Sequence, residues 1–474
     1  MGAKRPMKWD NVGKKSRHPA PGRWLTLGAL AALLAGSLLL AGCTAKPADE
    51  QTRKVVRIPF GSEESFNLTY GDYFAFKFPD VEVEIIPINQ IFVPGKSYYD
   101  AYEKLILEQK PDLVIVHSEL YTRWANKGML LDLEPFARKS GFDLSQFIPA
   151  AIDRLKENDE GKLFGLAPEI TSSGLYYNKD LFDKYGVPYP KNQMSWEETM
   201  ELSRRFPVDP DPEKRIYGIH LKYWTTFDFI QTLASTENAS YISPDMKRLT
   251  FDSDIWKKSF KHIIEGFRSK NLYYYYKDGK PVRYGPDETK EMDLFSRGKA
   301  AMTISGTEQL FRMKQWGTQD FNWDVVTVPV DPANPEYTRS FDVGTVFAIS
   351  ANGENPETAW KIVQYFNSEE AAKVKMKMDD VFSSRTAFAT TKDGQSLEPF
   401  YMLKRKKEEL DLTVTVPDTF YPVFSTPFQL LYIREIDEAV NGRKTIEEAI
   451  HTIQTEGQKL LDQAWAGGTS PPAK

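Results

Sequence analysis

The sequence predicts an α/β fold, in which strands and helices alternate and the strands form the core of each domain. Short apolar runs of strand character alternate with helical patterns between residues 55 and 126, and again between residues 174 and 328. The connections between them are short, which favours right-handed crossovers in layered α/β domains. After a 42-residue leader, 432 of the 474 residues remain, which is enough for two or three domains.

The elements of the first part follow from hydrophobic spacing. A β-rich run ended by Gly61 predicts the first strand, and alternation of apolar and acidic residues predicts the second. The third strand is apolar at nearly every position, which is typical of a strand inside a parallel sheet. We therefore expect strands over residues 55–60, 81–86 and 111–116, and helices over 64–78, 98–109 and 120–126.

The later elements are predicted by the same periodicities and by helix caps. Ser195 and Glu198 form a capping-box pattern that begins one helix, and three prolines between residues 207 and 212 mark a break. The sequence contains no internal repeat. We expect strands over 174–178, 300–304, 323–328 and 342–350, and helices over 179–185, 195–206, 226–236, 253–267, 287–297, 307–315, 355–366, 368–376, 397–410, 428–440 and 445–464.

The N-terminus has the layout of a secretory signal. Seven Lys and Arg residues precede an apolar run from Trp24 to Leu40, and small residues lead to Cys43, the only cysteine. This ending resembles a bacterial lipobox, in which the thiol receives a diacylglycerol, so we expect a palmitate-bearing lipoprotein. The resemblance implies a signal peptide over 1–42 and a flexible spacer over 43–54. The alternative is an uncleaved membrane anchor, because the run is near the lower limit of about 18 residues for a spanning helix.

Composition excludes several classes of function. Without the leader, 65 Asp and Glu face 54 Lys and Arg, and this acidic balance argues against a nucleic-acid partner. A single cysteine permits no internal disulfide. The five histidines have no metal-ligand spacing, and nucleotide-binding, serine-hydrolase and zinc-protease motifs are missing from the sequence. We therefore expect no enzyme activity, no cofactor and no metal. The 13% aromatic content suits either a stacking site or an aromatic core.

Four segments together resemble the family 1 extracellular solute-binding proteins of ABC importers, which include maltose-binding protein. They are GKLFGLAP (161–168) running into LYYNKDLFDKYGVP (175–188), SWEE (195–198), FSRGKAAMTISG (295–306), and GTVFAIS (344–350) followed by NPETAWKIV (355–363) and SEEAA (368–372). Their order and spacing extend the resemblance over residues 55–465.

The resemblance implies a two-lobe fold with a multi-strand hinge and a ligand cleft between the lobes. It implies crossings near residues 170–173, 341–344 and 382–385. The expected N-terminal lobe comprises 55–170 plus 341–385, and the C-terminal lobe 171–340 plus 386–466; residues 467–474 read as a disordered tail. The implied function is capture of a carbohydrate, an oligosaccharide by expectation, for the transmembrane subunits of an ABC permease. We expect a monomer anchored by lipid outside the cytoplasmic membrane, where ligand capture closes the lobes.

The resemblance also suggests residues for a sugar site, which needs flat aromatic faces and hydroxyl partners. Trp224 is the first stacking candidate. Trp124 and Trp316 are further candidates, and each could instead pack in the core. Many relatives carry a tryptophan near Glu308, and its absence here hints at a different glycan. Arg385 either binds ligand or braces the hinge. The polar candidates are Asp342, Thr171, Ser172, Asp228, Glu169 and Glu308.

Two other functions remain open at this point. A secreted glycoside hydrolase would need two carboxylates about 5–9.5 Å apart, and Glu169 with Glu308 or Asp342 are the pairs to consider. A lipoprotein that binds glycan for sensing or surface adhesion, without transport, would have the same sequence features as an importer subunit.

Overall fold

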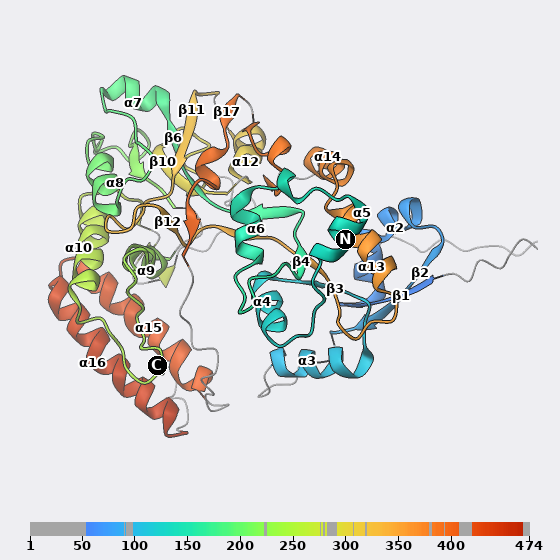
Figure 1. The fold of residues 1–474 in the computed structure, drawn as a ribbon. Helices are drawn as coiled ribbons and strands as arrows, with labels where there is room; N and C mark the ends of the chain where they lie inside the picture. The colour runs from blue at the N-terminus through green and yellow to red at the C-terminus, as the bar shows by residue number, and fades with distance from the viewer. Residues whose placement is uncertain are drawn as a thin grey trace, which may run out of the picture. The chain divides into compact units, whose positions relative to one another are not determined.

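The computed structural model of the chain describes most of the region that follows the predicted spacer (Figure 1). No helix of the described residues is long and apolar enough to cross a membrane. The leader, Cys43, Trp224 and the tail from residue 468 lie outside the described residues. The described ranges are 54–89, 91, 98–221, 225–274, 276–277, 280–281, 292–306, 308–317, 320–378, 382–392, 394–406 and 420–467.

The chain begins with a parallel pair of strands. β1 (Lys54–Phe60) pairs with β2 (Val81–Pro87) along its whole length. Between them run α1 (Glu63–Phe66), the π-helical turn η1 (Asn67–Gly71) and α2 (Asp72–Lys77), so the predicted helix over 64–78 is confirmed. Ser62 caps α1, because its side chain accepts a hydrogen bond from the backbone of Ser65.

A second sheet in this region has the order β3–β14–β4. β3 (Leu113–Val116) and β4 (Gly165–Leu166) both pair with β14 (Val346–Ile349), and both pairings are antiparallel. The expectation of a parallel setting for the third strand is therefore wrong, because an apolar run reports burial on both faces and not strand direction. The helical segments of this part are α3 (Tyr98–Gln109), α4 (Ser118–Asn126), α5 (Glu134–Ser140), η2 (Leu144–Gln146), α6 (Pro149–Leu155), α13 (Pro356–Phe366) and α14 (Glu369–Met378).

The largest sheet has the order β11–β6–β10–β7. Its central strand β6 (Gly174–Asn178) is antiparallel to both neighbours, and only β10 with β7 is a parallel pair. Helices follow or precede these strands as predicted. The other elements of this part are β7 (Tyr217–Ile219), β10 (Ala300–Ser305), β11 (Trp323–Thr327), α7 (Lys179–Tyr185), α8 (Trp196–Ser203), α9 (Thr226–Thr236), α10 (Asp254–Arg268), α12 (Glu308–Trp316), α15 (Phe420–Val440) and α16 (Ile446–Trp465).

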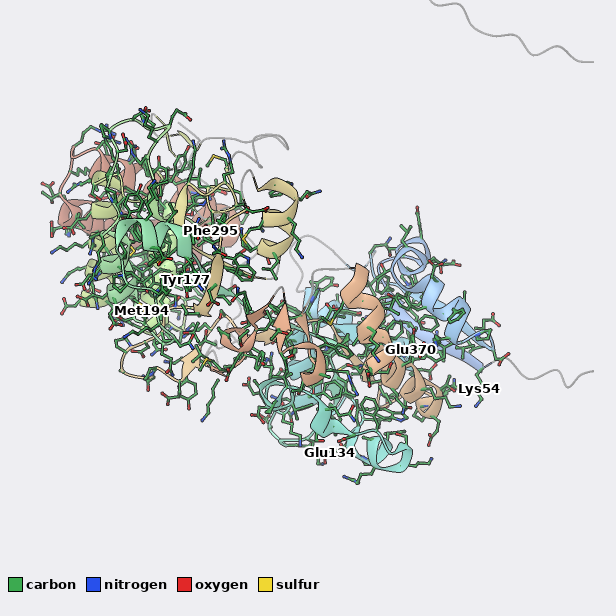
Figure 2. All side chains as sticks on the ribbon, turned by 90° about the horizontal axis from the view of Figure 1, so that it is seen from above. Lys54, Glu134, Tyr177, Met194, Phe295 and Glu370 are labelled. Atoms are coloured by element: carbon green, nitrogen blue, oxygen red, sulfur yellow. The ribbon has the colours of Figure 1, made fainter. Side chains whose placement is uncertain are left out.

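The first two sheets with their helices are called the N-lobe below, and the largest sheet with its helices is called the C-lobe. Buried apolar residues form two clusters, the first mainly in the N-lobe and the second in the C-lobe, and the first extends into the C-lobe sheet. The N-lobe cluster includes Trp124 and Phe347, and the C-lobe cluster includes Trp256 and Phe428. Tyr176 of β6 belongs to the first cluster. Figure 2 shows the side chains gathered in these two groups, with Lys54, Glu134 and Glu370 labelled in the N-lobe and Tyr177, Met194 and Phe295 in the C-lobe.

The three predicted crossings pair with one another in one small antiparallel sheet, called the hinge sheet below. Its order is β13 (Asp342–Val343), β5 (Glu169–Thr171) and β15 (Phe382–Ser383). The predicted strand over 342–350 is divided into β13 and β14 at Gly344, whose backbone N–H donates to the carbonyl of Glu169 at 2.9 Å. The lobe boundaries given above stay a prediction.

Three short strand pairs and two 3₁₀ turns, η3 (Thr386–Phe388) and η4 (Glu398–Phe400), complete the described chain. β12 (Tyr337–Thr338) is parallel to β18 (Lys404–Arg405), and β8 (Tyr276–Lys277) with β9 (Lys280–Pro281) and β16 (Thr391–Lys392) with β17 (Gln395–Ser396) are antiparallel. The helix expected over 397–410 is wrong for residues 397–406, and residues 407–410 lie outside the described residues. η4 is a single 3₁₀ turn, and the backbone of Lys404 donates to Glu336 at 2.8 Å. Of the helix expected over 287–297, residues 292–297 form turns, and the rest lies outside the described residues.

Candidate functional site

The hinge sheet brings several of the predicted polar residues together. Thr171 is exposed and lies opposite Asp342 in the pairing of β5 with β13, and Glu169 lies two residues before Thr171 on the same strand. Ser172 follows directly and is nearly buried, with its hydroxyl donating to the carbonyl of Phe400 at 2.5 Å. The sequence therefore placed four of its candidates correctly at one point of the fold.

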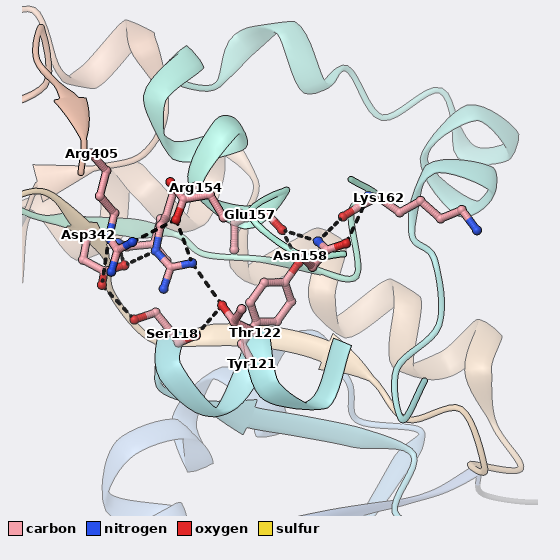
Figure 3. Close-up of polar contacts among 11 residues, drawn as sticks. Ser118, Tyr121, Thr122, Arg154, Glu157, Asn158, Lys162, Asp342 and Arg405 are labelled. Carbon is pink, nitrogen blue, oxygen red and sulfur yellow. Dashed lines mark hydrogen bonds and ion pairs between the residues drawn. The ribbon is translucent and has the colours of Figure 1, made fainter. Parts of the chain in front are cut away.

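The carboxylate of Asp342 is held by groups from the N-lobe (Figure 3). Its Oδ1 accepts hydrogen bonds from Arg154 Nε at 2.8 Å and from the backbone N–H of Val343 at 2.7 Å. Its Oδ2 accepts one hydrogen bond, from the hydroxyl of Ser118 at 3.0 Å. The side chain is 31% exposed, so solvent can reach part of this oriented carboxylate.

A second arginine faces the same carboxylate. Arg405 Nε lies 3.7 Å from Asp342 Oδ2, and Arg405 Nη1 lies 2.8 Å from Glu157 Oε2. Arg154 Nη1 lies 3.8 Å from the same Glu157 oxygen. The two arginines and two carboxylates thus alternate, and their charges balance.

Two short helices position this group of charges. Ser118 begins α4 directly after β3, and Arg154 lies in the last turn of α6. Tyr121 of α4 fixes one helix against the other, because its hydroxyl donates to the carbonyl of Leu155 at 2.6 Å. Burial raises the pKa of Tyr121 far above its usual value, so this hydroxyl remains a donor.

Glu169 has a different environment, on the central strand of the hinge sheet. It forms an ion pair with Lys375 of α14. The nearby Tyr70 has its pKa raised to about 12, first by burial and then by the negative charge of Glu169. These contacts hold Glu169 against the N-lobe.

The segment before α12 brings the C-lobe sheet to the hinge. Glu308 Oε1 accepts from the hydroxyl of Ser305 at 2.8 Å and from the backbone of Gly306 at 3.2 Å. The hydroxyl of Tyr176 donates to the carbonyl of Gly306 at 2.9 Å. A Cβ at Gly306 would lie 3.2 Å from the carbonyl oxygen of Ser172, so this turn packs closely against the crossing strand.

Asp228 and Trp316 occupy the ends of helices in the C-lobe. Asp228 Oδ2 closes a capping box at the start of α9, where it accepts from the backbone and the hydroxyl of Thr225 at 2.8 and 2.7 Å. Trp316 is half-buried at the last position of α12, at the far end of that helix from Glu308. Trp224 lies outside the described residues, immediately before this capping box.

Arg385 and Trp124 lie inside the N-lobe. Arg385 is 7% exposed: its Nη1 donates to the carbonyl of Asn367 at 3.0 Å, and the guanidinium lies 4.9 Å from the ring centre of Phe147. Trp124 is fully buried and packs edge-on against Tyr102, with ring centroids 5.0 Å apart. The structure therefore favours bracing for Arg385 and packing for Trp124, because neither side chain is accessible to a ligand in this arrangement.

The sequence analysis did not single out the residues that hold Asp342. Ser118, Arg154, Glu157 and Arg405 carry no motif of their own, and Arg405 and Glu157 are 248 residues apart in the chain. Only the fold brings them together. Within the ranges that the structure describes, no group of three His, Cys, Asp or Glu residues is arranged to hold a metal ion.

Comparison with known protein families gives one match that covers most of the described chain. The model of the family described as bacterial extracellular solute-binding proteins matches residues 65–373. Among curated proteins, the maltodextrin-binding protein MdxE of Bacillus subtilis is 24% identical over 441 residues, covering 89% of this chain and 96% of its own. The sn-glycerol-3-phosphate-binding periplasmic protein UgpB of Shigella flexneri is 22% identical over 337 residues, covering 68% and 72%.

Solved structures match over nearly their whole length. A family 1 extracellular solute-binding protein of Alicyclobacillus acidocaldarius has a TM-score of 0.59 at 13% identity, covering 86% of this chain and 98% of its own. A sugar transporter of Rhizobium etli in an open conformation has a TM-score of 0.55 at 19% identity, covering 85% and 99%. At these identities the likeness shows the fold, and it confirms the predicted two-lobe α/β class.

Proposed function

Because this chain belongs to the family of bacterial extracellular solute-binding proteins, we propose that it captures a carbohydrate outside the cytoplasmic membrane and delivers it to the transmembrane subunits of an ABC permease. The family's members are binding proteins, and we propose that this chain likewise leaves its ligand chemically unchanged. MdxE, which covers nearly the whole chain, is named for maltodextrin, and we therefore propose an oligosaccharide.

One observation carries the proposal at the level of the site. Asp342 lies in the hinge sheet, where Oδ1 accepts from two donors and Oδ2 accepts, among the described residues, only from the Ser118 hydroxyl. A half-open carboxylate beside the exposed Thr171 offers an acceptor and a hydroxyl to a sugar. Sugar hydroxyls need such partners, because burying them without hydrogen bonds is costly.

We propose that the ligand site extends from the hinge sheet into both lobes. Asp342, Thr171 and Ser172 supply the polar floor. Glu308 and Asp228 supply acceptors from the C-lobe, and Trp224 supplies a stacking face. Glu169, on the central strand of the hinge sheet, supplies a further carboxylate.

The test is a binding screen on residues 43–474. Calorimetry and thermal unfolding would be measured with maltodextrins, other plant and bacterial oligosaccharides, polyols and sn-glycerol 3-phosphate. We expect saturable binding of an oligosaccharide, with a gain in stability of about 2.7 kcal/mol at 100 times its Kd. Chromatography of the recovered sugar should show it intact. Failure to bind every carbohydrate in the panel, or cleavage of any of them, would contradict the proposal.

The stacking role of Trp224 has its own test. Trp224→Ala should weaken sugar binding while leaving the thermal midpoint of the ligand-free protein nearly unchanged. Trp316→Ala is the matched control on a tryptophan at the far end of α12. Equal affinity in the wild type and Trp224→Ala would remove this residue from the site.

We propose that Cys43 anchors the protein to the membrane by lipid, after cleavage of residues 1–42. A spacer of about ten residues would then connect the lipid to β1, which begins at Lys54. Cells that express the full chain would be fed a labelled fatty acid. The wild type should carry label and Cys43→Ser should carry none; label retained by Cys43→Ser would contradict the lipid anchor.

A further inference from the structure

Arg405 belongs to a strand pair that is attached to the C-lobe. β18 pairs with β12, and Lys404 and Lys406 donate from their backbone to Glu336 and Thr338 at 2.8 and 2.7 Å. The segment before β12 is bonded to the C-lobe, because the Gln193 side chain donates to the carbonyl of Pro335 at 3.0 Å. The backbone of Arg405 is therefore attached, through β12, to the C-lobe side of the hinge.

The guanidinium of Arg405 reaches the other side. Its Nη1 is bonded to Glu157 at 2.8 Å, and Glu157 directly follows α6 of the N-lobe. Its Nε lies 3.7 Å from Asp342 Oδ2, which is beyond hydrogen-bond length but close enough for strong charge attraction. Arg405 and Glu157 are 18% and 16% exposed, so water screens this ion pair only in part.

We propose that Arg405 is a positioning residue that couples ligand capture at Asp342 to the arrangement of the two lobes. This inference rests on the proposed function. The bond to Glu157 keeps the guanidinium from closing onto Asp342 Oδ2, and that oxygen remains open for a sugar hydroxyl. The positive charge of Arg405 meanwhile holds the carboxylate in place.

Loss of Arg405 and loss of the Glu157 charge should disturb the acceptor Asp342 Oδ2 in different ways. Loss of Arg405 removes the tie between the lobes and one of the charges that hold the Asp342 carboxylate in place. Loss of the Glu157 charge lets Arg405 move onto Asp342 Oδ2 and occupy the ligand's acceptor. Both changes weaken ligand binding, although Glu157 need not touch the ligand. Loss of the Glu157 charge acts through Arg405, so it has no further effect in a protein that already lacks Arg405.

The test is a double-mutant cycle on residues 43–474 with the oligosaccharide found in the screen. Arg405→Gln and Glu157→Gln should each raise the Kd by roughly three- to tenfold, as expected for loss of a partly buried charge pair. The double variant should match Arg405→Gln alone. Arg405→Lys keeps the charge and should recover part of the affinity. Lys139→Gln, which breaks an exposed ion pair with Glu357 inside the N-lobe, is the matched control and should leave the Kd unchanged.

A second measurement separates positioning from a general structural role. The wild-type Kd should rise between 50 and 500 mM salt, and Arg405→Gln should lose most of that dependence. An unchanged Kd in Glu157→Gln, or losses that multiply in the double variant, would overturn the inference. If the wild type binds no carbohydrate at all, it is the proposed function that fails, and the two failures are thereby distinct.

Discussion

An arginine lies beside each edge strand of the hinge sheet, and the two arginines have different partners. Arg385 follows β15 and is buried in the N-lobe, where it bonds to the carbonyl of Asn367 and stacks on Phe147. Arg405 approaches β13 from the β12–β18 pair and bonds to Glu157 across the hinge. Arg385 therefore bonds within the N-lobe, whereas Arg405 links the C-lobe side of the hinge to the N-lobe.

This difference separates stability from function. A cation with all its partners in one lobe keeps them in any lobe arrangement, so it contributes to folding and not to closure. A cation that joins two moving parts contributes differently to each arrangement, and only such a differential contribution can shift a conformational equilibrium. We therefore expect the β15 edge of the hinge sheet to control stability and the β13 edge to control affinity.

The largest effect should come from Arg385→Ala. It removes a buried cation, leaves the carbonyl of Asn367 without this donor, and opens a gap beside Phe147. We expect the free energy of unfolding to fall by about 2–4 kcal/mol, measured by urea denaturation. Arg405→Ala should cost at most about 1 kcal/mol in the same assay. Equal losses for the two variants would break the comparison.

The next effect is confined to alkaline pH and concerns Tyr70 beside Glu169. Its pKa is about 12 in the folded protein against 10.0 for an ordinary tyrosine, since burial and the Glu169 charge favour the protonated form. Below pH 10 the protonated Tyr70 hydroxyl makes its full contribution to the free energy of unfolding. Between pH 10 and 12 the unfolded state loses this proton before the folded state does, so about 2–3 kcal/mol of that free energy is lost.

Tyr70→Phe isolates this contribution from the other tyrosines. The stability of the variant relative to the wild type should rise between pH 9 and pH 11, measured by urea denaturation at each pH. A relative stability that is the same at both pH values would show that the hydroxyl of Tyr70 is not held neutral beside Glu169.

A smaller effect is expected for Asp342→Asn, and it should appear mainly in binding. The amide keeps the shape but loses the charge that faces Arg154 and Arg405. We expect the Kd for the oligosaccharide to rise about tenfold, equivalent to about 1.4 kcal/mol. Glu357→Gln, an exposed carboxylate in the N-lobe, is the control. An affinity within twofold of the wild type would remove Asp342 from the site.

The smallest effect should come from Ser118→Ala. The change removes the one hydrogen bond to Asp342 Oδ2 and leaves the two bonds to Oδ1 in place. We expect a two- to fivefold loss of affinity, about 0.5–1 kcal/mol, with no change in the thermal midpoint. A tighter complex would mean that Ser118 competes with the ligand for this oxygen.

The sequence predicts the fold class and the hinge well because both depend on short, local sequence motifs. The three expected crossings pair in one sheet, and Arg385 follows its edge strand β15. The direction of β3 and the 3₁₀ turn and strand that replace the helix over 397–410 depend on distant partners, β14 and β12. Periodicity contains no information about such partners.

The position of the candidate site could be predicted in part for the same reason. Asp342, Thr171 and Ser172 lie in or next to the predicted crossings, so the sequence could nominate them, and their contact with a ligand stays a prediction. Arg405 and Glu157 have no local signal, since an exposed-looking charge in a polar segment is indistinguishable from a solvated surface residue until the fold pairs it. Trp124 shows the converse: a tryptophan after a strand fits a stacking site or a core, and burial alone decides between them.

The central claim is that two lobes close around a sugar by motion at the hinge sheet. Small-angle X-ray scattering of residues 43–474, with and without a saturating concentration of the oligosaccharide found in the screen, measures this most directly. The account predicts that the radius of gyration decreases with the bound sugar and stays constant with a sugar that does not bind. An unchanged radius of gyration at full occupancy would contradict it.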